Sequence, residues 1–266
     1  MSLRGVLPAR GRRAGRMGET SWGKIGSRRS LARALAALAL ALTLSGCETT
    51  QEESAKLEKT AKHFTLAHRG LTIAHASTRV HVSAATVVHS SEGAAAVVTV
   101  TNTSAHALRS VPIAITVRNS GGQTVYQNNA AGLEAGLTSI SSLPAHGTVT
   151  WVDDQVPTTG GPASVSAIAG EAQAAGGPEP RIEVQGLHLA EAATGEASGT
   201  VRNRSGVTQQ HLVVYVTARR EGMILAAGRA VLGEVAAGAS VPFQAFLLGA
   251  PAGAKLEASA PASTPG

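Results

Sequence analysis

Alternating apolar and polar positions predict β-strands along most of the chain after residue 79. The clearest case is Val111–Arg118, in which Val111, Ile113, Ile115 and Val117 share one face. Strict alternation over eight residues is typical of a half-buried strand. Shorter runs of the same kind, separated by Gly- and Ser-rich breaks, are Val80–Val82, Ala95–Thr101, Gln123–Gln127, Thr148–Val152 and Ser164–Ile168. The pattern predicts an all-β fold class.

The strand pattern occurs twice along the chain. Gly199–Ser205 repeats Val98–Ser104, and Leu212–Arg219 repeats Val111–Arg118, both at an offset of 101 positions. Self-similarity at one offset indicates two copies of one structural unit, with chance similarity between simple strand sequences as the alternative. We therefore expect two tandem β-sandwiches, at residues 79–169 and 181–260.

The stretch between the two copies has the composition of a linker. Residues 170–180 are rich in Gly, Pro and Ala and show no apolar period. Such a segment buries too little apolar surface to offset the entropy of ordering it, so we expect it to be exposed and mobile. Residues 261–266 are predicted to form a disordered tail.

The first copy is longer than the second after its hairpin turn. Gly121–Gly147 spans 26 positions, whereas the matching Gly222–Gly238 spans 16. The ten extra residues fall within Asn128–Ser142, and the apolar residues of this segment are Leu133, Leu137 and Ile140. Apolar residues on a loop bury either on their own domain or on a partner. We predict that these three residues form the main partner-binding surface, with a neutral insertion as the alternative.

The chain begins with the pattern of a bacterial lipoprotein signal peptide. A basic stretch precedes the apolar run Ala34–Leu44, which is too short for a membrane-spanning helix of about 20 residues. This order predicts a signal peptide at residues 1–46. The residues that the signal peptidase recognises are then Leu44, Ser45 and Gly46. Cys47 would be the lipidated residue, carrying palmitate or a similar acyl chain, with an ordinary buried thiol as the alternative.

Lipidation would place the rest of the chain on the extracytoplasmic side of a bacterial cell membrane. Residues 47–78 begin with a polar, charged stretch and are predicted to form a lipidated tether. Residues 27–33 resemble a twin-arginine export motif. A basic leader of the ordinary secretory route is the alternative, and the choice between the inner and the outer membrane stays open.

The charge of the chain is divided unevenly. The whole sequence has a net charge of +6, but residues 1–46 hold nine Lys and Arg against one acidic residue. The remaining residues hold 14 basic and 16 acidic side chains, a net charge of −2. A nearly neutral mature chain lacks the basic surface of a nucleic-acid binder, so we expect no nucleic-acid partner.

The sequence contains no common catalytic signature. Neither a Gly-x-Ser-x-Gly nor a His-Glu-x-x-His motif occurs, and no phosphate-binding loop is present. Asp153 and Asp154 are the only aspartates. Adjacent side chains on a strand point to opposite faces, so these two carboxylates cannot act as an acid–base pair there. We predict a protein that is not an enzyme, with no catalytic residues and no cofactor.

Two further patterns invite a chemical interpretation. Five of the nine histidines fall close together in the sequence: His63, His68, His75, His81 and His89. Their spacings fit neither one helix face nor one strand face, so we predict no metal site, although distant histidines can converge in a fold. Asn102 and Asn203 begin matching Asn-x-Ser sequences, which we interpret as turn caps rather than glycosylation sites.

The second copy resembles the FxLYD-type family of small Ig-like sandwiches found in exported bacterial proteins. The resemblance lies in Gly199–Asn203, Leu212–Ala218, Gly222 and Gly238–Phe243. The Leu-Tyr-Asp run of the family is absent, because this chain has Val214-Tyr215-Val216, and the first copy lacks the Phe and has Trp151 nearby. The resemblance implies two tandem Ig-like β-sandwich domains after a signal peptide and a polar tether. It supplies no catalytic residue.

These patterns together predict a membrane-anchored lipoprotein that acts as a non-enzymatic binding or adaptor module in the cell envelope. Its partners would be membrane lipid, through Cys47, and an unknown envelope protein or cell-wall component. The alternative is a small-ligand or metal-binding envelope protein that uses the His-rich N-terminal stretch. A hydrolase with an unrecognised site is a third, weaker interpretation.

Overall fold

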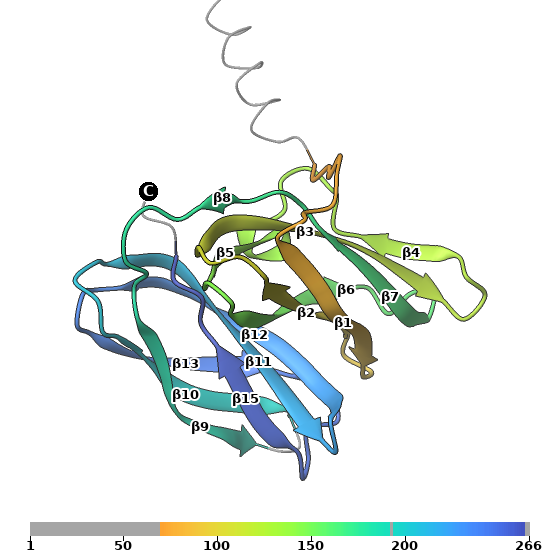
Figure 1. The fold of residues 1–266 in the computed structure, drawn as a ribbon. Helices are drawn as coiled ribbons and strands as arrows, with labels where there is room; N and C mark the ends of the chain where they lie inside the picture. The colour runs from red at the N-terminus through yellow and green to blue at the C-terminus, as the bar shows by residue number, and fades with distance from the viewer. Residues whose placement is uncertain (1–69, 192–193, 264–266) are drawn as a thin grey trace, which may run out of the picture. The chain divides into compact units, whose positions relative to one another are not determined.

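A computed structural model describes residues 70–191 and 194–263 of the chain (Figure 1). The predicted signal peptide, Cys47 and the tether up to residue 69 lie outside the described residues. Within the described ranges, no helix is both long and apolar enough to cross a membrane. The one helical turn there is the 3-10 turn η1 (Ala135–Leu137), and strands make up the other regular elements. This confirms the predicted all-β fold class.

The first sandwich has two antiparallel sheets (Figure 1). Its strands are β1 (Val80–His89), β2 (Ala94–Asn102), β3 (Leu108–Asn119), β4 (Thr124–Gln127), β5 (Ser139–Leu143), β6 (Thr148–Val156), β7 (Pro162–Ala169) and β8 (Gln173–Ala174). One sheet has the order β1-β2-β6, and in the other β4, β5, β7 and β8 all pair with β3. The alternating residues Val111, Ile113, Ile115 and Val117 of β3 are buried, as their pattern predicts.

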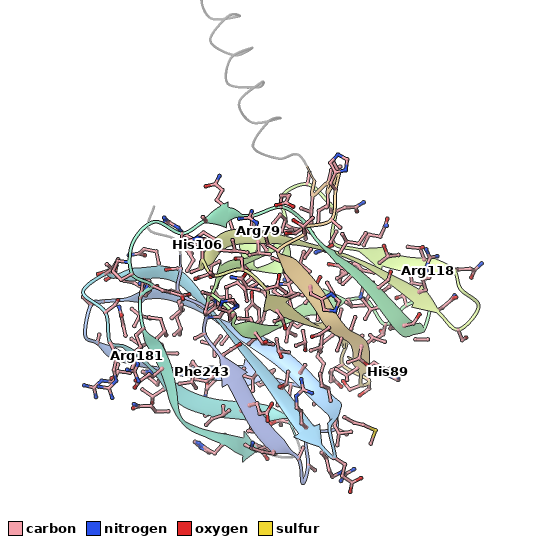
Figure 2. The ribbon with its side chains drawn as sticks, viewed as in Figure 1. Arg79, His89, His106, Arg118, Arg181 and Phe243 are labelled. Atoms are coloured by element: carbon pink, nitrogen blue, oxygen red, sulfur yellow. The ribbon has the colours of Figure 1, made fainter. Side chains whose placement is uncertain are left out.

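The second sandwich repeats this plan. Its strands are β9 (Ile182–Glu191), β10 (Glu196–Asn203), β11 (Gln209–Arg220), β12 (Met223–Val235), β13 (Ser240–Phe246), β14 (Leu248–Gly249) and β15 (Lys255–Ser259). The sheets have the orders β13-β10-β9 and β14-β12-β11-β15. Phe243 (Figure 2) belongs to a core shared with alternate residues of β11, among them Leu212, Val214 and Val216. The pairing order places β9, β10 and β11 where the first sandwich has β1, β2 and β3.

The two repeats differ in the strand that follows the hairpin. β12 pairs along the length of β11, whereas β4 and β5 divide that role along β3. Gln127 and Ile140 each pair with a residue of β3. The equivalent residues of β11, 101 positions later, pair with Ala227 and Leu232. The chain takes 13 steps between the first two residues and five between the other two, so the first repeat carries eight extra residues, not ten. We call residues 128–138 the insert.

One residue of the difference from ten follows from a correction to the repeat alignment, and the other lies in the hairpin, where Gly121–Gln127 spans six positions and Gly222–Ala227 spans five. The N–H of the Asn that ends the second strand of each repeat donates to the carbonyl of Gly147 in the first copy and of Ala239 in the second. Gly147 therefore corresponds to Ala239, one residue beyond the Gly238 that the sequence suggests. The left-handed turn position is then His146 (φ 54°) in one repeat and Gly238 (φ 71°) in the other.

The two sandwiches share a continuous apolar interface. Residues 94–98 of β2 and residues 212–218 of β11 are all buried, although a strand beside a single core buries only alternate residues. Continuous apolar runs are typical of strands covered on both faces. β12 lies against β6, β1 and β2, and Val213, Tyr215 and Ala227 belong to the core cluster of the first sandwich. One face of β2 and of β11 therefore packs on the core of its own sandwich, and the opposite face packs against the neighbouring sandwich.

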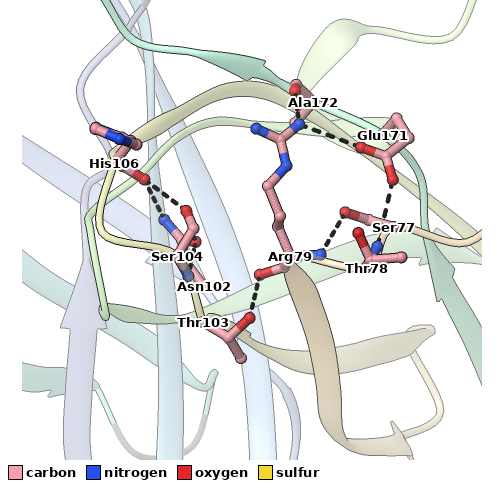
Figure 3. Close-up of polar contacts among 9 residues, drawn as sticks. All are labelled: Ser77, Thr78, Arg79, Asn102, Thr103, Ser104, His106, Glu171 and Ala172. Atoms are coloured by element: carbon pink, nitrogen blue, oxygen red, sulfur yellow. Dashed lines mark hydrogen bonds and ion pairs between the residues drawn. The ribbon is translucent and has the colours of Figure 1, made fainter.

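The predicted linker is fixed to the first sandwich along its course. Arg79 forms an ion pair with Glu171 and donates to the carbonyl of Ala172 (Figure 3). β8 then pairs with the start of β3, and the hydroxyl of Ser142 donates to Glu179. Most side chains of residues 170–180 are exposed, as expected. Backbone pairing and an ion pair tie parts of the segment to the first sandwich, and its mobility stays a prediction.

The first residues of the predicted disordered tail are also held. The hydroxyl of Ser141 donates to the carbonyl of Pro261, and the N–H of Ser263 donates to the buried side chain of Gln209 at 2.8 Å. Ala262 and Ser263 are buried. Residues 261–263 therefore lie against both sandwiches, because the hydrogen bonds with Ser141 and Gln209 order them.

Candidate functional site

The insert is anchored by a buried amide at its first residue. The side chain of Asn128 donates to the carbonyls of Ile113 at 2.7 Å and Leu137 at 2.8 Å, and accepts from the N–H of Ile115 at 2.8 Å. Two of these partners lie in β3, and the third ends η1. The amide therefore takes the place of the strand pairing that the insert interrupts, and it fixes η1 beside β3.

The backbone of the insert meets both sandwiches at Gly136. The indole Nε1 of Trp151 on β6 donates to the Gly136 carbonyl at 2.8 Å, and the hydroxyl of Tyr215 on β11 donates to the same oxygen at 3.3 Å. A Cβ at position 136 would lie 2.9 Å from Val213. The close approach of β11 therefore favours glycine at this position.

A buried arginine links the second sandwich to the first. The side chain of Arg229 on β12 is 6% exposed and reaches Asp154 on β6 at 2.8 Å and Glu134 in the insert at 3.0 Å. Burial acts to lower the pKa of Arg229, but the hydrogen bonds and charges of the two carboxylates outweigh it, and the pKa is raised. A paired, hydrogen-bonded charge of this kind is costly to leave without its partners.

The neighbouring Asp153 points the other way, into the first core. It is fully buried, accepts from the Tyr126 hydroxyl at 2.9 Å and accepts from the N–H of Gln155 at 3.0 Å. Burial raises the pKa of its carboxyl to about 6, although both hydrogen bonds favour the charged form. Burial and the adjacent carboxylate also raise the pKa of Tyr126. Asp153 and Asp154 thus have separate partners on opposite sides of β6, as strand geometry predicts.

A cleft lies between the sandwiches beside the insert. Its volume is about 320 Å³, and its walls come from β3, η1 and β5 in the first sandwich, from β11 in the second, and from Ser263. Ser110 and His211, which line it, have φ angles of 50° and 49°. These two residues are equivalent in the repeats, at the offset of 101. The cleft combines a cavity with polar side chains from both repeats.

The two Asn-x-Ser sequences form matching buried networks. The side chain of Asn102 is fully buried and donates to the carbonyl of His106, while its oxygen accepts from the N–H and hydroxyl of Ser104 (Figure 3). It also donates to the carbonyl of Pro144. Asn203 makes the same set of bonds in the second repeat. Both amides are engaged inside the fold, which agrees with a turn cap and removes them as glycosylation sites in the folded chain.

The structure corrects the predicted partner surface. Leu137 is 1% exposed and Ile140 is 0% exposed, and Ile140 lies within the first core cluster. The prediction that these two side chains contact a partner is wrong, because both are buried within the chain itself. Leu133 is half-buried and stays a candidate contact. The predicted recognition residues Leu44, Ser45 and Gly46 and the lipidation site Cys47 lie outside the described residues.

The histidines that the structure describes come from separate parts of the fold. His89 ends β1 at one end of the first sandwich, and His106 precedes β3 at the other end (Figure 2). Over the described residues, no group of three or more His, Cys, Asp or Glu is placed to hold a metal ion. His63 and His68 lie outside these residues, so the His-rich stretch as a whole stays untested.

Sequence reasoning did not identify the residues at the junction of the sandwiches. Arg229, Glu134 and Tyr215 meet across long sequence separations, and no local pattern relates them. Two signals were present in retrospect: the unbroken apolar runs of β2 and β11, and the insert in one repeat. Both indicate that the two units bury surface against each other.

The comparisons with known proteins add little to this picture. A scan against protein-family models and a search of curated proteins give no match. Among solved structures, red sea bream transglutaminase aligns with 83% of this chain and 34% of its own length, at 13% identity and a TM-score of 0.21. The chain thus spans about a third of that protein. A likeness this distant carries no argument about fold or activity.

Proposed function

We propose that this protein is a lipid-anchored envelope lipoprotein that serves as a non-enzymatic binding module. The anchor is Cys47, and the binding part is the pair of joined sandwiches. Lipidation would hold this pair at the extracytoplasmic face of a bacterial membrane. The resemblance of the second repeat to the FxLYD-type family agrees with this role and stays a prediction.

The observation that carries the proposal is the order of features around Cys47. A basic stretch, a short apolar run and two small residues directly precede the one cysteine of the chain. This is the order that directs export and lipid attachment. Two acyl chains on one residue are enough for stable anchoring, whereas a single chain holds only marginally.

The arrangement of the described residues supports a binding role. At the sandwich junction, Arg229 of the second sandwich pairs with Asp154 and Glu134 of the first. Their hydrogen bonds and the shared apolar interface fix the relative positions of the two sandwiches. A fixed pair presents loops and strand edges from both repeats to one partner, which favours recognition because less conformational freedom is lost on binding.

In-cell photo-cross-linking tests the binding role. A photoreactive amino acid is introduced separately at Ile168, Met223 and Phe246, which are exposed apolar positions, and at the buried Val98 as a control. We expect a discrete cross-linked envelope component from at least one exposed position and none from Val98. The same product should be lost when Cys47→Ala removes the anchor. Absence of a discrete product at every exposed position would contradict the proposal.

A further inference from the structure

The cleft beside the insert has a specific set of hydrogen-bonding groups. The hydroxyl of Ser139 donates to the carbonyl of Ala135 at 3.0 Å, and that of Ser141 donates to the carbonyl of Pro261 at 3.3 Å. Both protons are committed, so these oxygens present lone pairs to the cleft. Within the described part of the chain, the side chains of Ser110 and His211 make no hydrogen bond, and each can donate or accept.

The backbone at Ser110 and His211 gives a second indication. Among the described residues, four non-glycine residues have positive φ, and two of the four line this cleft. A side chain at such a φ costs free energy that glycine avoids. The chain uses glycine at 11 other positive-φ positions in the described ranges. Side chains kept at this cost, and facing one cavity, point to a use for them there.

The charges around the cleft favour a neutral ligand. None of its lining residues is Asp, Glu, Lys or Arg. Arg229, which lies behind Gly136, has its donors directed to Asp154 and Glu134. An anion would therefore find no free cation, and a cation would find no free carboxylate among these residues.

The cleft also has an apolar wall. Val213 and the buried ring of Tyr215 line it beside the serines. Its volume of about 320 Å³ lies at the lower end of the range of ligand pockets. A ligand with a compact ring, hydroxyl groups that donate and accept, and C–H faces would match this combination of polar and apolar surface.

We propose that this cleft binds a small, neutral, polyhydroxylated ligand, namely a single sugar unit of an envelope glycan. Ser139 and Ser141 accept hydrogen bonds from ligand hydroxyls, Ser110 and His211 donate or accept, and Val213 and Tyr215 contact the C–H face. The inference rests on the proposed binding role and names the ligand class. It also gives the insert a purpose, because η1 forms a wall that the second repeat does not have.

Titration of the full chain with N-acetylglucosamine and, separately, with glucose tests the proposal. The chain carries Cys47→Ala, so that the result does not depend on lipidation. Nuclear magnetic resonance should show saturable shifts of the His211 ring and of the Ser110 amide. Ser110→Gly and His211→Gly each remove one ligand contact, and we expect binding to weaken by about twofold to tenfold, corresponding to the loss of one hydrogen bond.

The matched control is His146→Gly, because His146 is also an exposed residue with positive φ but lies outside the cleft. All three glycine variants should melt at the same temperature as the parent or higher, since glycine relieves the backbone. Only the two cleft variants should lose affinity. If neither sugar gives a saturable shift up to its solubility limit, the ligand class is wrong. If both cleft variants bind as tightly as the parent, the site is wrong. Failure of the proposed function appears separately, as loss of acylation or of the cross-linked partner.

Discussion

Trp151 and Tyr215 belong to different sandwiches and donate to the same acceptor. The indole nitrogen of Trp151 lies 2.8 Å from the carbonyl oxygen of Gly136, and the hydroxyl of Tyr215 lies 3.3 Å from it. A carbonyl oxygen has two lone pairs, so both are used. Because Gly136 lies in the insert, the extra residues of the first repeat join the two sandwiches.

The first prediction tests this role of the insert. Leu137→Ala empties a fully buried position in the insert and should lower the free energy of unfolding by about 2–5 kcal/mol. Leu133→Ala, at a half-buried position in the same segment, should cost less than about 1 kcal/mol. Urea denaturation followed by circular dichroism measures both. Equal, small effects would mean that the insert is a free loop.

The second prediction concerns the charges at the sandwich junction. Arg229→Ala leaves Asp154 and Glu134, which are partly exposed, without their buried cation and should cost about 1.5–3 kcal/mol, as for the loss of hydrogen bonds to charged groups. Glu134→Gln should cost less than about 1 kcal/mol, because the Glu134 side chain is 43% exposed and solvent screens it. Arg181→Ala, whose side chain is 78% exposed, is the surface control. A small effect of Arg229→Ala would contradict a junction held by this residue.

The third prediction is a pH dependence from Asp153. Its pKa rises from 3.8 to about 6 on folding, so the folded state binds the proton more tightly between these values. Stability from this group is therefore present below about pH 4 and is lost as the pH rises to about 6. The loss is about 3 kcal/mol, since one pKa unit corresponds to about 1.4 kcal/mol.

Asp153→Asn removes the buried charge and keeps the shape of the side chain. The variant should be more stable than the parent at pH 7 and should lack the parent's fall in stability between pH 4 and pH 6. Its amide oxygen still accepts from Gln155, and its NH2 group donates to the Tyr126 oxygen. Chemical denaturation at a series of pH values measures the difference. Parallel curves for parent and variant would show that Asp153 is solvated or otherwise charge-stabilised.

The fourth prediction tests the equivalence of the two repeats. Asn102 and Asn203 make matching buried hydrogen bonds. Replacing either by Ala leaves carbonyls and N–H groups without partners, at about 1–3 kcal/mol for each buried group left unsatisfied. We expect Asn102→Ala and Asn203→Ala to cost similar amounts in urea denaturation. A large cost from one and none from the other would indicate that the repeats do not share this network.

Local patterns sufficed for the strands and for the repeat. The alternation in Val111–Arg118 gave β3, and the same pattern 101 positions later gave β11. The position of Pro112 did not follow from such rules, which place proline at a strand start or on an edge. It lies inside the central strand β3, where the neighbour on one side changes from β8 to β7. Where the neighbouring strand changes, one residue of β3 has no strand to which its N–H could donate, and proline can occupy that position.

The site was beyond local patterns for a physical reason. Leu137 and Ile140 have the composition of an apolar contact surface, and only the fold shows that both are buried, with Ile140 in the first core. The junction of Arg229 with Glu134 joins residues 95 positions apart. No periodicity reports such a contact, although the unbroken apolar runs of β2 and β11 indicate that a second surface covers them.

The measurement that tests the account most directly is the chemical state of Cys47. Mass spectrometry of the N-terminal peptide from membrane-extracted protein should find Cys47 as the first residue, with acyl chains attached. Labelling of growing cells with an alkyne fatty acid should mark the parent chain and leave Cys47→Ala unmarked. A mature chain that begins elsewhere with an unmodified Cys47, or equal labelling of the parent and Cys47→Ala, would contradict the lipoprotein assignment.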